Sequence, residues 1–427
     1  MALFLGLDIG TTAIKAGVFD ASGVPRAEAR EPMPWRAVPT GAELDPAALL
    51  TAVLAVSDAA LGQVEGTIAG VGVAGLAETG MLLDARGEPV VPAIAWYDWR
   101  DGGEAERLSS ELGDEAFARR TGLPVRPLCS LAKYAWMRAN WPESERGVRW
   151  LSVPEWIVRA LGGEEAAESS LASRTAFYDL HTRAPWADAL AWAGAPAGLA
   201  PEHLPAGTPL GTADGTLPRI RGATLAVGGH DHLAAAVGAG VAGEGEVLNS
   251  CGTAEAWVRA TAPLGPERVT ETVAAGLTVG WHAIEGRQAI VGGAPSGAAL
   301  QAVLDLLGVT DRASLERAAL ETDPGGLELS GLFDRGLTIT GLGPGASPAA
   351  LYRAALESLG RNGADLLARI NGVAGPHTRL VVTGGWAEGV AVREIKALHL
   401  GPFEHLPGVA TGARGAALAA ERACKGS

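Results

Sequence analysis

The sequence predicts an α/β protein of two domains, from its length, its composition and the alternation of two hydrophobic patterns. At 427 residues the chain exceeds one ordinary hydrophobic core, since a domain takes roughly 150 residues. Hydrophobic residues make up 48% and charged residues 19%, which is typical of a globular protein. Short runs of Val, Ile and Leu alternate with longer Ala/Leu/Glu/Arg stretches of helical period, which favours α/β over all-α or all-β.

The domain number follows from a repeated hairpin pattern. Residues 3–20 predict a strand, LFLGLDIG, a Gly-Thr-Thr turn and a second strand, IKAGVFD. The segment EVLNSCGTAEAWVRA repeats this order around Gly252-Thr253, which indicates an internal duplication. A stretch rich in Pro, Gly and Thr, residues 205–222, predicts the junction. We therefore expect domains over residues 1–222 and 223–427.

Charge and cysteine content restrict the partners and the compartment. The chain has 34 Lys+Arg against 48 Asp+Glu, a formal charge of -14, which repels nucleic acid and anionic membranes and favours a small-molecule partner. The three cysteines form neither a CxxC pair nor an even-numbered disulfide framework. The first residues resemble a buried strand more than a signal peptide, and no uncharged apolar run reaches the ~18 residues of a membrane span. These features predict a cytoplasmic protein without nucleic-acid or membrane partners.

The first hairpin carries a pattern suited to phosphate. Gly10 lets the backbone approach an anion, Thr11 and Thr12 offer donors to phosphate oxygens, and Asp8 offers a carboxylate to a metal ion. Lys15 adds positive charge. A plain hairpin with an acidic residue at its mouth is the alternative, but the similar turn at Gly252 and Thr253 favours phosphate binding. A third element, Gly384-Gly385 after the strand RLVV, is typical of a turn that lets adenosine lie against the backbone.

Taken in order, these motifs resemble those of a known family. DIGTT, NSCGTAE and VVTGGWAEG are similar to the two phosphate motifs and the adenosine motif of the actin/hexokinase/Hsp70 superfamily. CSLAKYAWMRAN and TGLGPGASPAALYRAALES resemble the two signatures of FGGY carbohydrate kinases. The resemblance implies two ribonuclease-H-like (actin-like ATPase) domains with an interdomain cleft, and transfer of phosphate from ATP, with Mg2+, to a sugar or polyol. Gly389 stands where glycerol kinases have an Asn near the adenine.

The candidate for the base in this chemistry is Asp231. Phosphoryl transfer to an alcohol needs a carboxylate near the attacking hydroxyl. The segment LAVGGHDHLAAAVGAG places Asp231 between a Gly-Gly turn and an Ala-rich helix, and the position also matches the catalytic Asp of FGGY kinases. An ordinary N-cap is the alternative. His230 and His232 are expected to contact substrate rather than metal, because neighbours two apart on a helix diverge.

The acceptor side is expected in the first domain. Glu78 resembles a glutamate of glycerol kinases, whereas Ala77 replaces the arginine that these enzymes carry beside it. Trp96, Asp98 and Arg100 alternate along an expected strand, so one face would present an aromatic ring, an acceptor and a cation to the substrate. A strand end with a salt-bridged rim is the alternative.

The acceptor and the catalytic status stay open at this point. A ketose, xylulose-like, or a polyol is favoured because no Lys/Arg cluster predicts an acid-binding pocket. A non-catalytic sugar- or nucleotide-binding regulator of the same superfamily is the competing hypothesis, and a homodimer is one option for the assembly.

Overall fold

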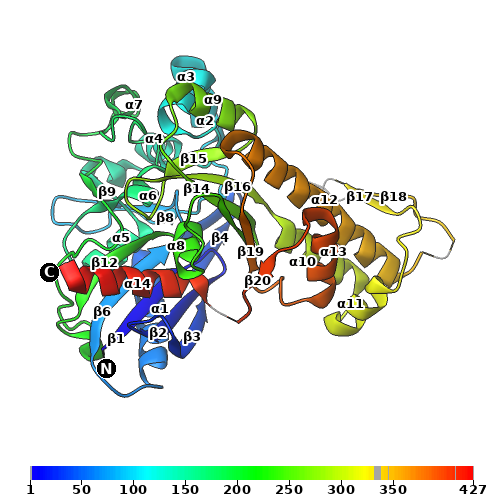
Figure 1. Ribbon diagram of the computed structural model, residues 1–427. Coiled ribbons are helices and arrows are strands. Elements are labelled where there is room, and N and C mark those ends of the chain that lie inside the picture. The colour runs from blue at the N-terminus through cyan, green and yellow to red at the C-terminus, as the bar shows by residue number, and fades with distance from the viewer. Residues whose placement is uncertain (1, 331–337, 345, 409, 427) are drawn as a thin grey trace. The chain divides into compact units, whose positions relative to one another are not determined.

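The computed structural model describes residues 2–330, 338–344, 346–408 and 410–426 (Figure 1). They form two compact units: residues 1–240, 262–289 and 410–427, and residues 241–261 and 290–409. Strands and helices alternate along the chain, so the predicted α/β class is confirmed. The first unit extends past residue 222, and the last helix returns to it. Within the described residues no helix has both the length and the apolar character that crossing a membrane requires.

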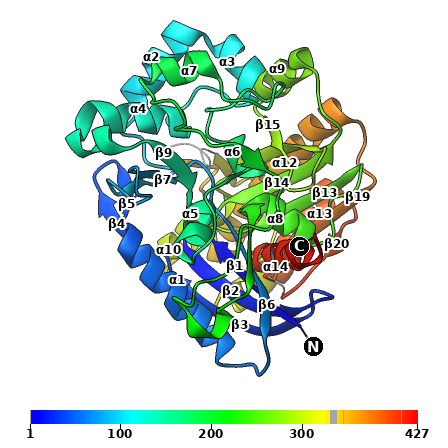
Figure 2. The same cartoon turned by 90° about the vertical axis from the view of Figure 1, so that its left-hand side faces the viewer.

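The first unit is built on a five-stranded sheet, of which Figure 2 shows several strands side by side. β1 pairs antiparallel with β2, with Ile9 opposite Ile14, which confirms the predicted hairpin. β6 runs parallel to both β1 and β12. In spatial order the strands are β12 (Thr224–His230), β6 (Ile68–Gly75), β1 (Leu3–Ile9), β2 (Ala13–Asp20) and β3 (Pro25–Pro32).

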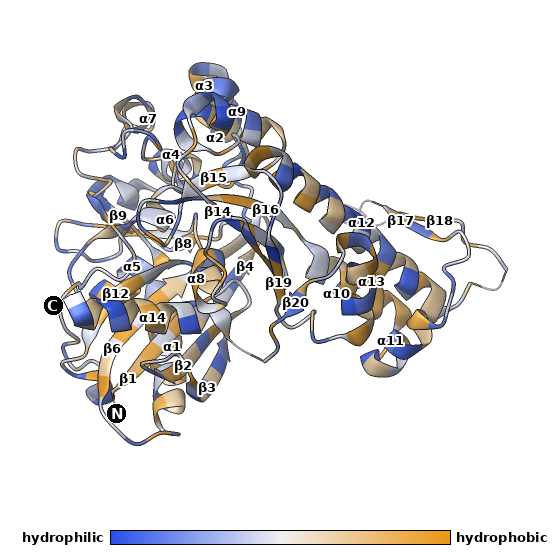
Figure 3. Cartoon of the chain, viewed as in Figure 1, coloured by the Kyte–Doolittle hydropathy of each residue, from blue (hydrophilic) through white to orange (hydrophobic). Residues whose placement is uncertain are grey.

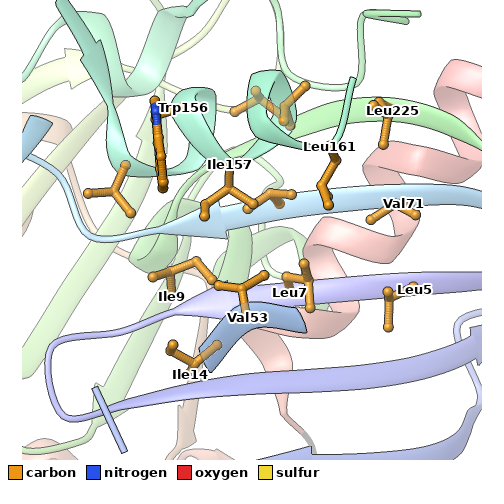
Figure 4. Packing of buried hydrophobic residues seen from close by; sticks show 14 of the residues in the cluster. Leu5, Leu7, Ile9, Ile14, Val53, Val71, Trp156, Ile157, Leu161 and Leu225 are labelled. Atoms are coloured by element: carbon orange, nitrogen blue, oxygen red, sulfur yellow. The ribbon is translucent and has the colours of Figure 1, made fainter. Parts of the chain in front are cut away.

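The two faces of this sheet follow from the alternation of side chains along β1. Leu5, Leu7 and Ile9 point into a buried core that α1 (Pro46–Leu61) and α5 (Val153–Ala160) cover (Figure 4). On the opposite face, a Cβ on Gly6 would overlap with the backbone of α14 (Thr411–Gly426). Glycine here thus lets the small-residue helix α14 lie directly on the sheet.

The second unit repeats this strand order. β13 pairs antiparallel with β14 and parallel with β19, which confirms the second predicted hairpin. The long helix α12 alternates hydrophobic and hydrophilic residues, as a helix with one buried face does (Figure 3). In spatial order the strands are β16 (Gln288–Ala294), β14 (Glu255–Thr261), β13 (Glu246–Cys251), β19 (Arg379–Thr383) and β20 (Glu404–His405).

The other elements fall into the same two units. The first unit also has β4 (Trp35–Val38), β5 (Gly41–Leu44), β7 (Gly80–Leu83), β8 (Ala93–Ile94), α2 (Gly102–Leu112), α3 (Asp114–Thr121), α4 (Ser130–Asn140), β9 (Arg149–Ser152), β10 (Ala167–Glu168), α6 (Ser169–Ala172), α7 (Ala187–Trp192), β11 (His203–Leu204), α8 (Asp231–Gly238), α9 (Pro266–Ala274) and β15 (Thr278–Trp281). The second also has α10 (Ser296–Leu307), α11 (Arg312–Leu320), β17 (Glu328–Ser330), β18 (Thr338–Thr340), α12 (Pro348–Ala374) and α13 (Val390–Leu400).

Candidate active site

Asp231 begins α8 directly after β12, as the sequence predicts. Gly228 and Gly229 lie within β12 rather than in a turn after it. Because β12 runs parallel to β6, the segments that follow these two strands leave the sheet at the same edge. Asp231 therefore lies in the first unit. This differs from the expected position in a second domain of residues 223–427, because β12 pairs with the first sheet.

The Asp231 carboxylate lies between two histidines. Its Oδ1 accepts a hydrogen bond from the backbone N–H of His232 at 2.7 Å and lies 3.2 Å from Nε2 of His230. Burial opposes ionisation, but the His232 side chain, this amide hydrogen bond and Lys15 hold the pKa of Asp231 below its ordinary value. Asp231 is therefore ionised at neutral pH, as a proton acceptor must be.

The two histidines converge on Asp231, contrary to the expectation that they diverge. One ligand atom from each of His230, Asp231 and His232 lies within 4.8 Å of the others. His230 precedes α8 with an extended backbone, so the helical spacing argument does not apply to its ring. Burial lowers the pKa of His230 to about 3, and its Nδ1 has no hydrogen-bond partner among the described residues. His230 is thus a neutral side chain beside the carboxylate.

Asp8 and Lys15 face each other across the first hairpin. Asp8 stands opposite Lys15 in the β1–β2 register, and Lys15 Nζ lies 3.3 Å from Asp8 Oδ2. Asp8 Oδ1 is buried and has no hydrogen-bond partner in the described parts of the chain. Burial raises the pKa of Asp8, and Asp231 adds to that increase. One strand, β6, separates Asp8 from the end of β12, so the two backbones are roughly 10 Å apart.

Two tryptophans hold the turn of this hairpin. Trp96 Nε1 donates to Thr11 Oγ1 at 2.9 Å, and Trp35 Nε1 donates to the Thr11 carbonyl at 2.7 Å. The Gly10 amide donates to the Ala13 carbonyl at 3.1 Å, which closes the turn, and Thr12 is exposed. Trp96 therefore contacts the turn of the first hairpin, a contact that alternation along a strand does not predict.

Glu78 follows β6 at the same edge of the sheet as Asp231. Its carboxylate is paired with Arg174, whose Nη2 lies 2.6 Å from Oε1. Ala77 is buried in the core beneath and offers no polar group. Sequence reasoning missed Arg174, because the residue lies 96 positions from its partner and belongs to none of the motifs.

Asp98 and Arg100 do not form the expected substrate-facing strand. β8 ends at Ile94, so the alternation argument fails beyond that residue. Arg100 donates to both carboxylate oxygens of Asp98, at 3.0 and 2.8 Å, and Asp98 is fully buried. Lys133, from the first FGGY-like signature, donates to the Asp98 carbonyl at 2.8 Å. Both charges are therefore satisfied inside the protein, in line with the salt-bridged alternative.

The second unit carries the other predicted glycines. The amide of Gly252 donates to the Ala254 carbonyl at 3.2 Å, and the Thr253 carbonyl accepts from the Ala298 amide in the first turn of α10 at 3.0 Å. Gly384 has a φ of 100°, and a Cβ there would lie 2.6 Å from the Cys251 carbonyl oxygen. A Cβ on Gly385 would meet no heavy atom within 4 Å. The open side of this turn is therefore at Gly385.

Gly389 has different surroundings. A Cβ there would lie 2.5 Å from Arg312 Nη2 and would overlap with the carboxylate of Glu316. Arg312 in turn lies over the ring of Trp386, 4.2 Å from its centroid. The absence of a side chain at Gly389 thus makes room for the Arg312–Glu316 ion pair. These surroundings give no support to the expectation that Gly389 lies beside the adenine.

Comparison with known proteins adds independent findings. Residues 3–238 match the N-terminal domain of the FGGY family of carbohydrate kinases. The chain is 32% identical to the glycerol kinase of Gloeobacter violaceus, over 97% of this chain and 87% of that protein. It is 34% identical to the xylulose kinase of Streptomyces coelicolor, over 56% and 50% of the two chains.

The solved structures agree with the sequence comparisons. The xylulose kinase of Rhodospirillum rubrum superimposes with a TM-score of 0.85 at 26% identity, over 99% of this chain and 92% of that one. This similarity confirms the predicted two-domain actin-like ATPase fold, and the comparisons give no support to a non-catalytic regulator. The chain belongs to the FGGY family of carbohydrate kinases, enzymes that transfer a phosphoryl group from ATP to an alcohol group of a small sugar or polyol.

Proposed function

We propose that Asp231 is the general base that receives the proton of the acceptor hydroxyl. The hydroxyl oxygen forms a bond to the γ-phosphorus of ATP, the bond from this phosphorus to the β–γ bridging oxygen breaks, and ADP leaves. The supporting observation is the ionised carboxylate of Asp231 at the sheet edge where Glu78 also lies. Because bond making to phosphorus is weak in a loose transition state, a base of low pKa suffices if it is well positioned.

Asp8 is the proposed site for Mg2+. Its Oδ1 is buried without a hydrogen-bond partner among the described residues, and carboxylate oxygen is a ligand that Mg2+ prefers, directly or through water. The residues therefore fit the ion, which when bound neutralises charge on the phosphates. Lys15 and the donors of Gly10, Thr11 and Thr12 would bind phosphate oxygens in the first unit. In the second unit we assign phosphate contacts to Gly252 and Thr253, and adenosine contacts to Gly384 and Gly385.

The proposed acceptor is a small uncharged polyol or a ketose such as xylulose. Two of the relatives above are named glycerol kinase and xylulose kinase. His230 and His232 beside Asp231, and Glu78 at the same sheet edge, offer groups that bind hydroxyls. We also propose a cytoplasmic protein without nucleic-acid or membrane partners, in line with the charge of -14. A homodimer is our proposal for its assembly.

A coupled ADP-release screen over polyols, ketoses, aldoses and sugar acids tests this function. The wild-type protein is expected to turn over at least one neutral acceptor, and Asp231→Asn is expected to lose roughly 10²–10⁴-fold in kcat while ATP binding stays within threefold. A wild-type rate indistinguishable from background on every acceptor would refute the activity. A variant with near-normal kcat would remove Asp231 from its role.

A further inference from the structure

The pair formed by Glu78 and Arg174 is held in an unusual backbone conformation. Glu78 has a φ of 60°, one of three positive values among the described non-glycine residues, and Ala176, two residues after Arg174, is another. Such conformations are energetically unfavourable for residues with a side chain and cluster at functional sites. The Ser130 hydroxyl donates to the Glu78 carbonyl at 3.1 Å, which fixes this backbone.

The hydrogen bonds of the pair leave groups open on both partners. Arg174 donates from Nε to Glu78 Oε1 at 2.7 Å and from Nη1 to Thr278 Oγ1 at 2.9 Å, and its Nη2 also lies 2.6 Å from Oε1. All contacts with Glu78 use Oε1, so no described residue donates to Oε2. A guanidinium has five N–H donors, of which these contacts use three. One acceptor oxygen and two N–H groups therefore remain for a ligand.

The same short segment ties this pair to the base. Ser170, in α6, accepts a hydrogen bond from the His230 amide at 2.9 Å, and Arg174 follows α6 by two residues. The charge of Arg174 contributes to the low pKa of His230, after burial and the other histidine. Glu78 follows β6 by three residues, and Gly75 at the end of β6 pairs with His230 at the end of the neighbouring parallel strand β12. The segment that carries Arg174 is thus held against the end of β12 by the Ser170 hydroxyl, and the guanidinium acts electrostatically on His230, the residue before Asp231.

We propose that Glu78 and Arg174 bind two neighbouring hydroxyls of the acceptor. This inference rests on the proposed function. Glu78 Oε2 accepts from one hydroxyl and the free N–H groups of Arg174 donate to the other. The charges of Glu78 and Arg174 cancel. An acidic acceptor would therefore find the guanidinium already paired, and its carboxylate would be repelled by the negative charges of Glu78 and Asp231. The acceptor class is therefore an uncharged vicinal diol, and Arg174 is a specificity-determining residue.

Kinetics on matched neutral and acidic acceptors test this proposal. With glycerol and xylulose as probes, Arg174→Gln is expected to raise the KM of the neutral acceptor roughly 10- to 100-fold, the effect of losing hydrogen bonds to a charged group, with the KM of ATP changed less than twofold. Arg174→Lys should raise the acceptor KM less than Arg174→Gln does, since lysine keeps the positive charge but lacks the planar set of guanidinium N–H donors. Glu78→Gln frees the guanidinium, so the kcat/KM ratio of glycerate to glycerol should rise at least tenfold.

Two further variants make the test decisive. Arg120→Gln removes a comparable ion pair, with Asp179 at 2.8 Å, and should leave every acceptor KM within twofold. Thr278→Val removes one bond from Arg174 without touching charge and should raise the acceptor KM about threefold even if Arg174→Gln is too unstable to purify. With wild-type activity intact, unchanged acceptor KM values in the Arg174 and Thr278 variants and an unchanged acid-to-polyol ratio would overturn the inference. An inactive wild type would refute the proposed function itself.

Discussion

The two hairpins of this kinase have the same strand arrangement but differ in the charge of their side chains. In the first unit Asp8 stands opposite Lys15, and the Lys15 side chain is 43% exposed. The corresponding place in the second hairpin has Ser250 opposite Ala256, and both residues are small. The duplicated strand order thus carries the charged residues of the proposed phosphate and Mg2+ site in one copy and small residues at the corresponding place in the other. The chemistry lies in a few residues, not in the fold.

The units also differ in how they bury ionisable groups. In the second, Lys396 lies within hydrogen-bonding distance of Glu255, and both side chains are almost fully buried. In the first, Glu155 and Glu168 are buried without a cation bonded to either carboxylate among the described contacts, and burial raises their pKa values to about 8 and about 7. Both units pair buried charges, as Arg100 does with Asp98 in the first, but the first unit also holds two buried acids that burial keeps protonated to a higher pH.

Replacing the charged residue of the first hairpin should give the largest effect. Asp8→Asn keeps the shape but removes the charge that we assign to Mg2+, so kcat/KM should fall roughly 10²–10³-fold, the scale of several kcal/mol of charge stabilisation. The Mg2+ concentration for half-maximal rate should also rise. Steady-state rates across a Mg2+ titration measure both. Ser250→Ala, its counterpart, should stay within twofold, and equal losses in both variants would contradict the assignment of charge chemistry to one hairpin.

Breaking the buried pair of the second unit should reduce stability instead of altering chemistry directly. Lys396→Met leaves Glu255 buried without its cation, which should cost about 3–5 kcal/mol in the free energy of unfolding. The double variant with Glu255→Leu should regain most of this loss. Urea unfolding measures both variants. Asp365→Asn, which removes an exposed i,i+4 pair with Arg369, is the control and should cost under about 0.5 kcal/mol; a similar cost for Lys396→Met would show that the pair is not required.

Local patterns account for what the sequence could predict. The two hairpins and the start of α8 at Asp231 depend on turn residues and hydrophobic runs within a few positions, and all three are confirmed. The strand expected over residues 96–100 was wrong because Arg100 turns back onto Asp98 and also pairs with Glu43 at 2.7 Å. That contact joins residues 57 positions apart, and no local pattern carries it.

The proposed acceptor site shows the same limit of local sequence patterns more clearly. Glu78 could be found from its place after a strand, but its carboxylate pairs with Arg174, which follows five intervening helices, α2 to α6. Signals for such a pair exist only in the folded chain.

The smallest effect expected comes from the unpaired buried acids of the first unit. Glu168 Oε2 accepts from Ser170 Oγ and the Leu171 amide, whereas Oε1 has no partner in the described structure. With a pKa of about 7 in the folded protein, Glu168 keeps a proton that the unfolded chain releases near pH 4.5. Stability should therefore fall as the pH rises from about 4.5 to about 7, by up to roughly 3 kcal/mol for this group.

Glu168→Gln tests this linkage, because the amide keeps an acceptor at Oε2 and places its N–H groups on the unpartnered side. The variant should lose most of this decline, so its free energy of unfolding relative to wild type should be higher at pH 8 than at pH 5. Urea unfolding at both pH values gives the difference. A decline as steep as that of the wild type would show that Glu168 is already ionised in the folded protein at pH 5 and does not cause the decline. The contrast with the paired Lys396 and Glu255 would then concern the presence of a cation alone, since both units would bury a charged carboxylate.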